Sequence, residues 1–316
     1  MDSRIGSILM LHRTAPYVDG NLVYNENMKI SPEELNQLII HYKKANRVFL
    51  SIDEATEIIR SGKKPKQKFI VLTIDDGYKD NLRYGYSIFQ QHRVPFCIYI
   101  TNSFPNNTTD IWWYALEHVI QHNDKLNLPD GRKLKNDTTE EKKRNFLHLR
   151  QVVIEEHFRD SYALFRQLGD FNFNVEKERS EMCLSWSEIT ELANDPLVTI
   201  GCHTVNHLPL SKLTDQEVRS EIDNSRDELK QKLGRPVKHF AFPFGSRVEA
   251  GPREYELAKE SGFDSIVTTL HGYVRLGDNP FCLDRIFLSP LRGSSVFQRE
   301  IFWNIKSMAR TVRSII

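Results

Sequence analysis

The chain has 316 residues, 40% of them hydrophobic, which is enough for the core of one large α/β domain or two smaller ones. Lys and Arg (43) balance Asp and Glu (42) to a formal charge of +1, so no global field favours nucleic acid. No apolar run approaches a membrane span, the N-terminus does not resemble a signal peptide, and the four cysteines are widely spaced. These features predict a soluble, cytoplasmic protein that binds no nucleic acid.

Short apolar segments alternate with helical patterns along the chain. Strands are expected at 5–11, 69–74, 96–101, 197–202, 239–242, 265–268 and 283–288. Helices are expected to begin at Ser31-Pro32, at the capping box Thr214-Asp-Gln-Glu217 and at Pro252. Several strands are continuous apolar runs, as in a parallel sheet that is covered on both faces. The alternation predicts an α/β barrel or a doubly wound sheet, with the chemistry at the carboxyl ends of the strands.

Two segments depart from this rhythm. The stretch from about 105 to 181 is polar, charged and helical in pattern, and we expect it to be a helical insertion in a single domain rather than a second domain. Residues 296–316 form an amphipathic helical pattern with a basic face. Docking of that helix on the body of the protein is favoured, and peripheral contact with a membrane surface is the alternative.

Two polar elements directly follow predicted strands. Asp75 and Asp76, in Thr-Ile-Asp-Asp-Gly-Tyr, are adjacent carboxylates at the end of a buried strand, where they need a charge partner. Taken alone, this element is more often a strand-to-turn cap. His203 and His207 follow the strand at 197–202 and supply the imidazoles that zinc combines with carboxylates. Together the two elements predict a metal site in which one carboxylate is a ligand and the other is a base.

Three motifs, taken in order, carry a resemblance to a known family. They are Thr73-Ile-Asp-Asp-Gly-Tyr78, Gly201-Cys-His-Thr-Val-Asn-His-Leu-Pro-Leu210 and Phe240-Ala-Phe-Pro-Phe-Gly245. Their order and spacing resemble the polysaccharide deacetylase family (carbohydrate esterase family four), in the branch with a Phe-Ala-aromatic-Pro-aromatic-Gly third motif. The resemblance covers most of the chain outside 105–181. It implies a distorted (β/α)7 barrel and metal-dependent hydrolysis of an N-acyl group on an amino sugar.

The resemblance assigns a role to each matching residue. Asp75 corresponds to the catalytic base, and Asp76, His203 and His207 correspond to the ligands of a divalent metal, usually Zn²⁺, with Co²⁺ or Ni²⁺ also accepted. Three protein ligands leave a position for a water that the metal acidifies and Asp75 deprotonates.

Three further residues lie within or beside the motifs. The turn that contains Phe244 lies where the family supplies an oxyanion-binding amide, so the Phe244 N–H is the candidate donor. Tyr78 is a second candidate for contact with the substrate or the oxyanion. Cys202 neighbours a ligand, but the alternation of side chains along a strand points it away from His203 and out of the metal shell.

Two residues that the family usually has are missing. The third motif commonly carries an arginine that orients the base, and Ala241 stands near that place. Arg285 is a candidate for the same charge, and a surface pair with Asp284 is the alternative. The family's late histidine, which protonates the leaving amine, has no counterpart after residue 271. His12, at the end of the first strand, is the preferred general acid, and His271 is the alternative.

The leading prediction is therefore a metal-dependent N-deacetylase that acts on an amino sugar of a polysaccharide or glycan precursor. A deformylase acting on a formamido sugar would use the same chemistry. A non-catalytic glycan-binding protein on the same scaffold is the alternative from a different functional class. Trp112 and Trp113 can stack on a sugar, although core packing is favoured for at least one of them.

Overall fold

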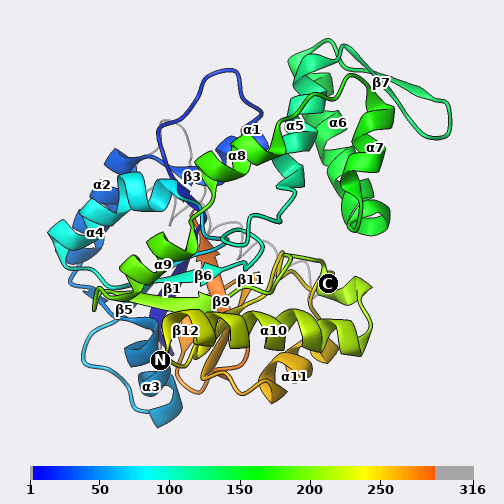
Figure 1. The fold of residues 1–316 in the computed structure, drawn as a ribbon. Helices are drawn as coiled ribbons and strands as arrows, with labels where there is room; N and C mark the ends of the chain where they lie inside the picture. Colours follow the sequence, from blue (N-terminus) through cyan, green and yellow to red (C-terminus); the bar gives the residue numbers. More distant parts are fainter. Residues whose placement is uncertain (1–2, 289–316) are drawn as a thin grey trace, which may run out of the picture.

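A computed structural model describes residues 3–288 of the chain (Figure 1). The amphipathic pattern predicted at 296–316 lies outside these residues. Within them, no helix is both long and apolar enough to cross a membrane.

Seven parallel strands close into a barrel. They are β1 (Arg4–Leu11), β5 (Phe69–Ile74), β6 (Phe96–Ile100), β9 (Val198–Cys202), β10 (His239–Ala241), β11 (Ser265–His271) and β13 (Leu283–Phe287). Neighbours around the ring follow the order β1, β13, β11, β10, β9, β6 and β5, and pairing of Gly6–Leu11 with Phe69–Ile74 joins β5 back to β1. This closure confirms the predicted barrel and excludes the open, doubly wound sheet.

The strand sequences explain why the barrel is buried on both sides. All six residues of β5 are buried, and its side chains alternate between two faces. Leu72 and Ile74 belong to a large cluster shared with the surrounding helices, whereas Phe69 and Val71 belong to a second cluster with α3 (Ile52–Ser61). Thr73 and Asp75 follow Phe69 and Val71 by steps of two, so this second face leads to the carboxyl end of the strand and to the site.

Besides α3, the outer helices are α2 (Pro32–Lys44), α4 (Tyr86–His92), α9 (Trp186–Ala193), α10 (Asp215–Leu233) and α11 (Pro252–Glu260). Three of them, α2, α10 and α11, begin at the predicted residues. The Thr214 side chain accepts a hydrogen bond from the Glu217 N–H at the start of α10, and Gly234 ends that helix with φ 66°. Pro252 occupies the first turn of α11.

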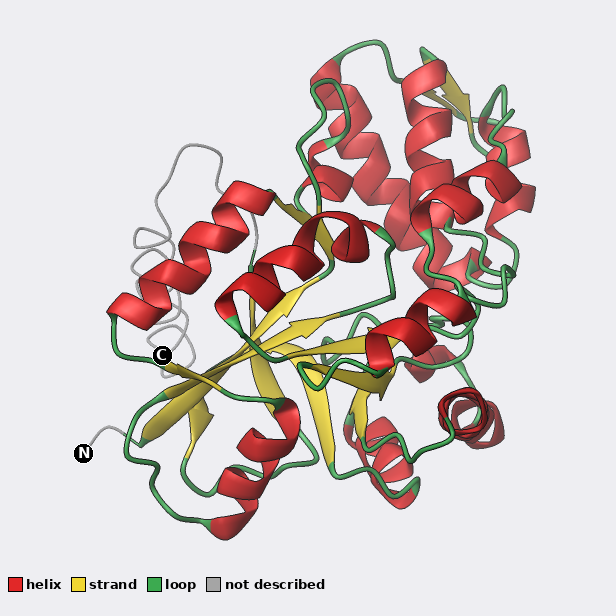
Figure 2. Ribbon diagram, turned by 60° about the vertical axis from the view of Figure 1, so that its left-hand side comes forward, coloured by secondary structure: helices red, strands yellow, loops and turns green. Residues whose placement is uncertain are grey.

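Four of the five helices between β6 and β9 in sequence lie beside the barrel and form a helical layer (Figure 2). They are α5 (Trp112–His122), α6 (Thr139–Val152), α7 (Ser161–Leu168) and α8 (Val175–Met182), and the π-helical turn Val153–His157 extends α6. Helices α5, α6 and α7 pack around a hydrophobic cluster of their own, which includes Val119, Phe146 and Phe165, whereas α8 has no buried residue. A hairpin of β7 (Lys125–Asn127) and β8 (Lys133–Lys135) was not predicted, because its three-residue strands are too short to show a period of two.

The remaining elements are short. They are β2 (Arg13–Thr14), α1 (Val23–Glu26), β3 (Lys29–Ile30), β4 (Val48–Phe49), β12 (Val274–Arg275), the π-helical turn Asn81–Gly85 and the 3-10 turn Leu210–Lys212.

Candidate metal centre

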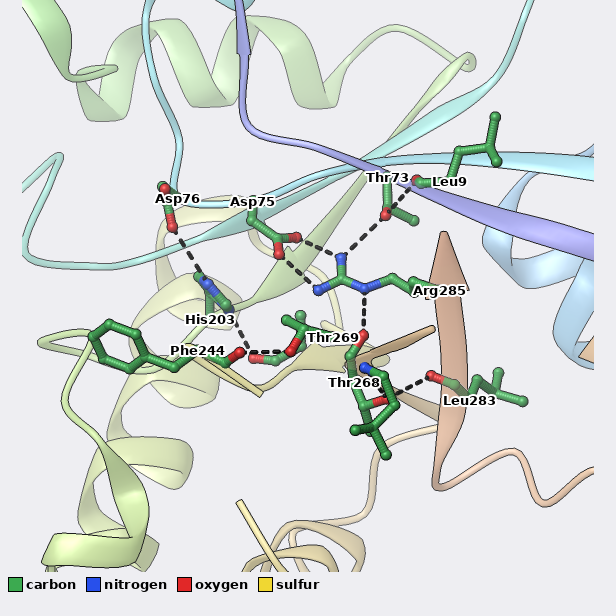
Figure 3. A network of polar contacts seen from close by, with 12 residues as sticks. Leu9, Thr73, Asp75, Asp76, His203, Phe244, Thr268, Thr269, Leu283 and Arg285 are labelled. Atoms are coloured by element: carbon green, nitrogen blue, oxygen red, sulfur yellow. Dashed lines mark hydrogen bonds and ion pairs between the residues drawn. The ribbon is translucent and has the colours of Figure 1, made fainter. Parts of the chain in front are cut away.

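The predicted site residues meet at the carboxyl ends of β5 and β9, and Figure 3 shows Asp75, Asp76 and His203 side by side. Asp76, Thr204, His207 and Phe244 have left-handed backbone conformations, with φ of 76°, 66°, 54° and 58°. They are four of the eight non-glycine residues with positive φ within residues 3–288. Such conformations are costly and gather where a fold must aim particular groups.

Three potential ligands converge on one point. The Asp76 Oδ1 atom lies 3.4 Å from the His203 Nε2 atom and 3.3 Å from the His207 Nε2 atom. The three ligand atoms lie within 4.8 Å of one another. Ligands about 2.1 Å from a tetrahedral zinc would be about 3.4 Å apart, so the two Asp–His separations fit such an ion.

The hydrogen bonds of the three residues also favour a cation. The His203 Nδ1 atom lies 2.7 Å from the Ala241 carbonyl oxygen, to which it can only donate, and this contact leaves Nε2 to face the Asp76 carboxylate. Within residues 3–288, the buried Asp76 Oδ1 atom has no hydrogen-bond donor. A buried acceptor between two imidazoles is unfavourable unless a proton or a metal lies between them.

Asp76 and His203 shift each other's pKa values toward the charged forms. Burial alone would raise the pKa of Asp76, but His203 and His207 outweigh it and hold that pKa well below its ordinary value. Burial lowers the pKa of His203, while Asp76 and Asp75 raise it, and the net shift is upward. Both shifts describe an anionic carboxylate that binds positive charge, which is the character required of a metal ligand.

Asp75 is held by a fully buried arginine. The Arg285 Nη1 and Nη2 atoms donate to the Asp75 Oδ1 and Oδ2 atoms, each over 2.7 Å (Figure 3). The side chains are 0% and 2% exposed, respectively. Burial raises the pKa of Asp75, but Arg285, His203 and His12 together lower it by more, and the pKa lies below its ordinary value. Asp75 is therefore an ionised carboxylate in a fixed orientation, with lone pairs left for a further donor.

Arg285 does not form the surface pair with Asp284 that the sequence left open. Its Nε donates over 2.8 Å to the Thr268 carbonyl oxygen, and its Nη1 donates over 3.1 Å to the Thr73 Oγ1 atom. Thr73 in turn donates over 2.8 Å to the Leu9 carbonyl oxygen. The arginine reaches Asp75 from β13, whereas Ala241 on β10 offers only its carbonyl oxygen, to His203. The contribution of Thr73 was missed, because a buried threonine in an apolar strand carries no sequence signal.

The two candidate general acids lie in different surroundings. The His12 Nδ1 atom is buried and has no hydrogen-bond partner within residues 3–288, and its ring meets that of Phe287 edge-on at 5.7 Å. Burial lowers the pKa of His12, against the charges of Asp76 and Asp75, which act on this imidazole. His271 ends β11 with an exposed side chain. Of the two candidate acids, His12 is therefore the one that interacts with the charges of the site.

Phe244 lines a cleft, whereas the side chain of Tyr78 is buried. The Phe244 ring packs edge-on against His207, with 4.8 Å between ring centroids, and its carbonyl oxygen accepts from the Thr269 hydroxyl over 2.6 Å. Within residues 3–288, its N–H has no backbone or side-chain acceptor. The Tyr78 side chain is buried, and its hydroxyl accepts from the Trp113 Nε1 atom over 2.8 Å.

A cleft of about 350 Å³ opens beside His207, between the barrel and the helical layer. Its walls include His207, Phe244, Trp112, Trp113, Asp110 and Phe158. Trp113 lies 5.5 Å from His207 between ring centroids, whereas most of Trp112 is buried in the helical layer. Both tryptophans border the cleft, but only Trp113 packs against His207, and Trp112 serves mainly as part of the hydrophobic core of the helical layer.

Cys202 lies outside the metal shell, as predicted. Its Sγ atom contacts the Ser225 hydroxyl at 3.1 Å, on the side of the strand that faces α10.

The sequence is similar to known proteins. The family model for polysaccharide deacetylase matches residues 62–264. YxkH of Bacillus subtilis strain 168, named as a candidate polysaccharide deacetylase, is 19% identical over 248 residues, or 78% of this chain. The match covers 61% of YxkH, so the chain spans about three fifths of that relative's length.

Solved structures share the fold. The deacetylase PplD of Streptococcus pyogenes, in complex with acetate, has a TM-score of 0.60 and 16% identity over 90% of this chain and 92% of its own. IcaB of Ammonifex degensii has a TM-score of 0.59 and 18% identity over 91% and 93%. A de-N-acetylase of Aggregatibacter actinomycetemcomitans has a TM-score of 0.60 and 14% identity over 93% and 98%. With the match to the family model over residues 62–264, the chain belongs to the polysaccharide deacetylase family.

Proposed function

We propose that this protein is a metal-dependent N-deacetylase that hydrolyses the acetamido group of an amino sugar in a polysaccharide or glycan precursor. The observation that carries the proposal is the pairing of two adjacent carboxylates with different partners. Asp76 faces two imidazoles, whereas Asp75 is held ionised by Arg285. A family member that only bound glycans would have no use for this second, oriented carboxylate.

In the proposed reaction, Asp76, His203 and His207 hold a divalent cation, most simply Zn²⁺, with Co²⁺ or Ni²⁺ as alternatives. Such a cation would acidify a water and polarise the acetamido carbonyl. Asp75 takes the proton from the attacking water, and Arg285 fixes the plane of this base. The Phe244 N–H donates to the carbonyl oxygen as negative charge develops there. His12 transfers a proton to the leaving nitrogen, so that acetate and the free amine separate.

We propose that residues 105–181 belong to the same catalytic domain and form one wall of the substrate cleft. Trp113 would then present its ring to a sugar beside His207, and Tyr78 would act indirectly by positioning Trp113 through their hydrogen bond.

Removal of metal should abolish the activity reversibly. After dialysis against a chelator, acetate release from N-acetylated oligosaccharides is expected to fall below detection, because Asp75 cannot deprotonate unactivated water at a useful rate. Addition of one equivalent of Zn²⁺, Co²⁺ or Ni²⁺ should restore release. Activity that survives in verified metal-free protein would contradict the proposal. Metal binding without release from any N-acetyl sugar would favour the glycan-binding alternative, and release of formate alone would favour the deformylase.

Substitution of His12 should separate the two candidate acids. In His12→Gln, kcat is expected to fall roughly 100-fold with unchanged metal content, because proton donation to a leaving group typically contributes 10²- to 10⁴-fold. His271→Gln is the matched control and should keep kcat within about twofold of the original protein. The opposite pattern, measured by acetate release under saturating substrate, would move the acid role to His271.

A further inference from the structure

The ring of Phe244 lies between Arg150 and His207, one of the three potential metal ligands. Arg150 projects from α6, and its guanidinium carbon lies 5.8 Å from the centroid of the Phe244 ring. The other neighbour of that ring is His207, at 4.8 Å between centroids. Residues Ile154 and Phe158, about one and two turns further along, line the substrate cleft. Arg150 does not itself line the cleft, but its guanidinium lies against Phe244, a residue of the cleft wall, on the side of the helical layer.

The charge of Arg150 has no direct partner. Within residues 3–288, its half-buried guanidinium makes no hydrogen bond and no ion pair, only the contact with Phe244. Glu249 is the carboxylate that acts on it from a distance, and Glu249 is already engaged by the Ser246 hydroxyl. A partly desolvated cation with all five donors unused is unfavourable unless something else binds it.

The other charged groups of the cleft are already engaged. Arg159 donates over 2.7 Å to Glu217, and both residues lie toward solvent. The carboxylate of Asp110 accepts from the Ser161 hydroxyl over 3.0 Å and from the Trp112 N–H over 3.3 Å. Among the charged residues of 3–288 considered above, Arg150 is thus the cation beside this cleft that is available to a ligand.

We infer that Arg150 binds an oxyanion, a phosphate or a carboxylate, that the amino-sugar substrate carries. A guanidinium presents parallel N–H groups that match the oxygens of either anion, and the Phe244 ring keeps the guanidinium plane in place. The inference rests on the proposed function, and it narrows the substrate class to anionic amino sugars. A sugar whose acetamido group lies at the metal would extend past Phe244, so that an acidic substituent can reach Arg150.

The test compares three sugars on variants of one helix. The sugars are N-acetylglucosamine 1-phosphate, N-acetylmuramic acid and neutral methyl N-acetylglucosaminide, and kcat/KM is measured for each. Arg150→Met keeps an apolar chain on Phe244 without the charge, Arg150→Lys restores the charge, and Arg144→Met removes an exposed arginine of the same helix. The original protein should prefer at least one anionic sugar by roughly 10- to 100-fold. Arg150→Met should bring the ratio of kcat/KM between the anionic and the neutral sugar close to one.

Arg150→Lys should recover part of the preference that Arg150→Met loses. The control Arg144→Met should keep the full preference of the original protein. The anion that is preferred identifies its source, phosphate or carboxylate. Equal kcat/KM for charged and neutral sugars in the original protein would overturn the inference, as would an unchanged preference in Arg150→Met.

Binding of the same sugars to metal-free protein is also measured by calorimetry. This measurement needs no hydrolysis, so it tests the role of Arg150 independently of the proposed deacetylase activity. Tighter binding of an anionic sugar that depends on Arg150 supports the inference even if no sugar is hydrolysed. A loss of thermal stability in Arg150→Met without any change in binding would show a purely structural arginine and overturn the inference.

Discussion

Asp75→Asn should lower kcat for acetate release roughly 1,000-fold while the protein still binds one metal ion. The amide cannot accept the proton of the attacking water, and removal of a general base typically costs 10²- to 10⁴-fold. The three ligand atoms belong to other residues, so the metal content measured by mass spectrometry should not change. Because the amide also weakens the contact with Arg285, folding of the variant is checked by circular dichroism at the assay temperature.

Two matched variants make the result specific. Asp76→Asn should lose activity together with the metal, because it removes the carboxylate that faces both imidazoles. Asp284→Asn removes a carboxylate next to Arg285 in sequence and should keep kcat within about twofold. If Asp75→Asn lost the metal and Asp76→Asn retained it, the two aspartates would have to exchange roles.

The sequence was informative about this site where the residues are close together along the chain. Asp75 and Asp76 are adjacent, and His203 and His207 are four residues apart, each pair directly after an apolar strand. The parallel arrangement of β5, β6 and β9 then brings the two strand ends together, as expected for this class of fold.

The partner of Asp75 was harder to predict. Arg285 lies 210 residues away in sequence from Asp75. The two meet because the barrel closes, with β13 beside β1 and β1 beside β5. No local pattern reports that closure, so the sequence could not separate a buried arginine from a surface one. The position of Arg150 depends in the same way on how the helical layer packs against Phe244.

Arg285→Met should lower the free energy of unfolding by about 3–5 kcal/mol, the usual result of leaving one member of a buried ion pair without its partner. The pair is buried on both sides, so solvent does not compensate for the loss. Chemical denaturation of metal-free protein measures the change without a contribution from metal binding. Arg60→Met is the matched control: it breaks an exposed pair with Asp264, 2.9 Å long, and should cost less than about 1 kcal/mol.

The contribution of Asp75 to the free energy of unfolding should depend on pH with opposite signs in Arg285→Met and in the original protein. In the original protein the pKa of Asp75 is below its unfolded value of 3.8, so this residue stabilises the fold above that value and loses its contribution as the pH falls. Without Arg285, burial raises the pKa of Asp75, and the carboxyl stabilises the fold only while it is protonated. The difference in stability between the two proteins should therefore widen as the pH rises from about 4 to 7. A constant difference across that range would contradict the role of Arg285 as the charge partner.

A double variant distinguishes loss of a contact from isolation of a charge. Asp75→Asn with Arg285→Met removes both charges, so it should be more stable than Arg285→Met alone, even though it lacks more of the original interactions. Its stability should also be nearly independent of pH between about 4 and 7 relative to Asp75→Asn, because the titrating carboxyl is absent. Both proteins that carry Asp75→Asn should show the same roughly 1,000-fold loss of kcat, because each lacks the base. Recovery of stability in the double variant would show that the cost of Arg285→Met comes from the isolated Asp75 charge, and a further loss would show that it comes from the missing contacts of Arg285.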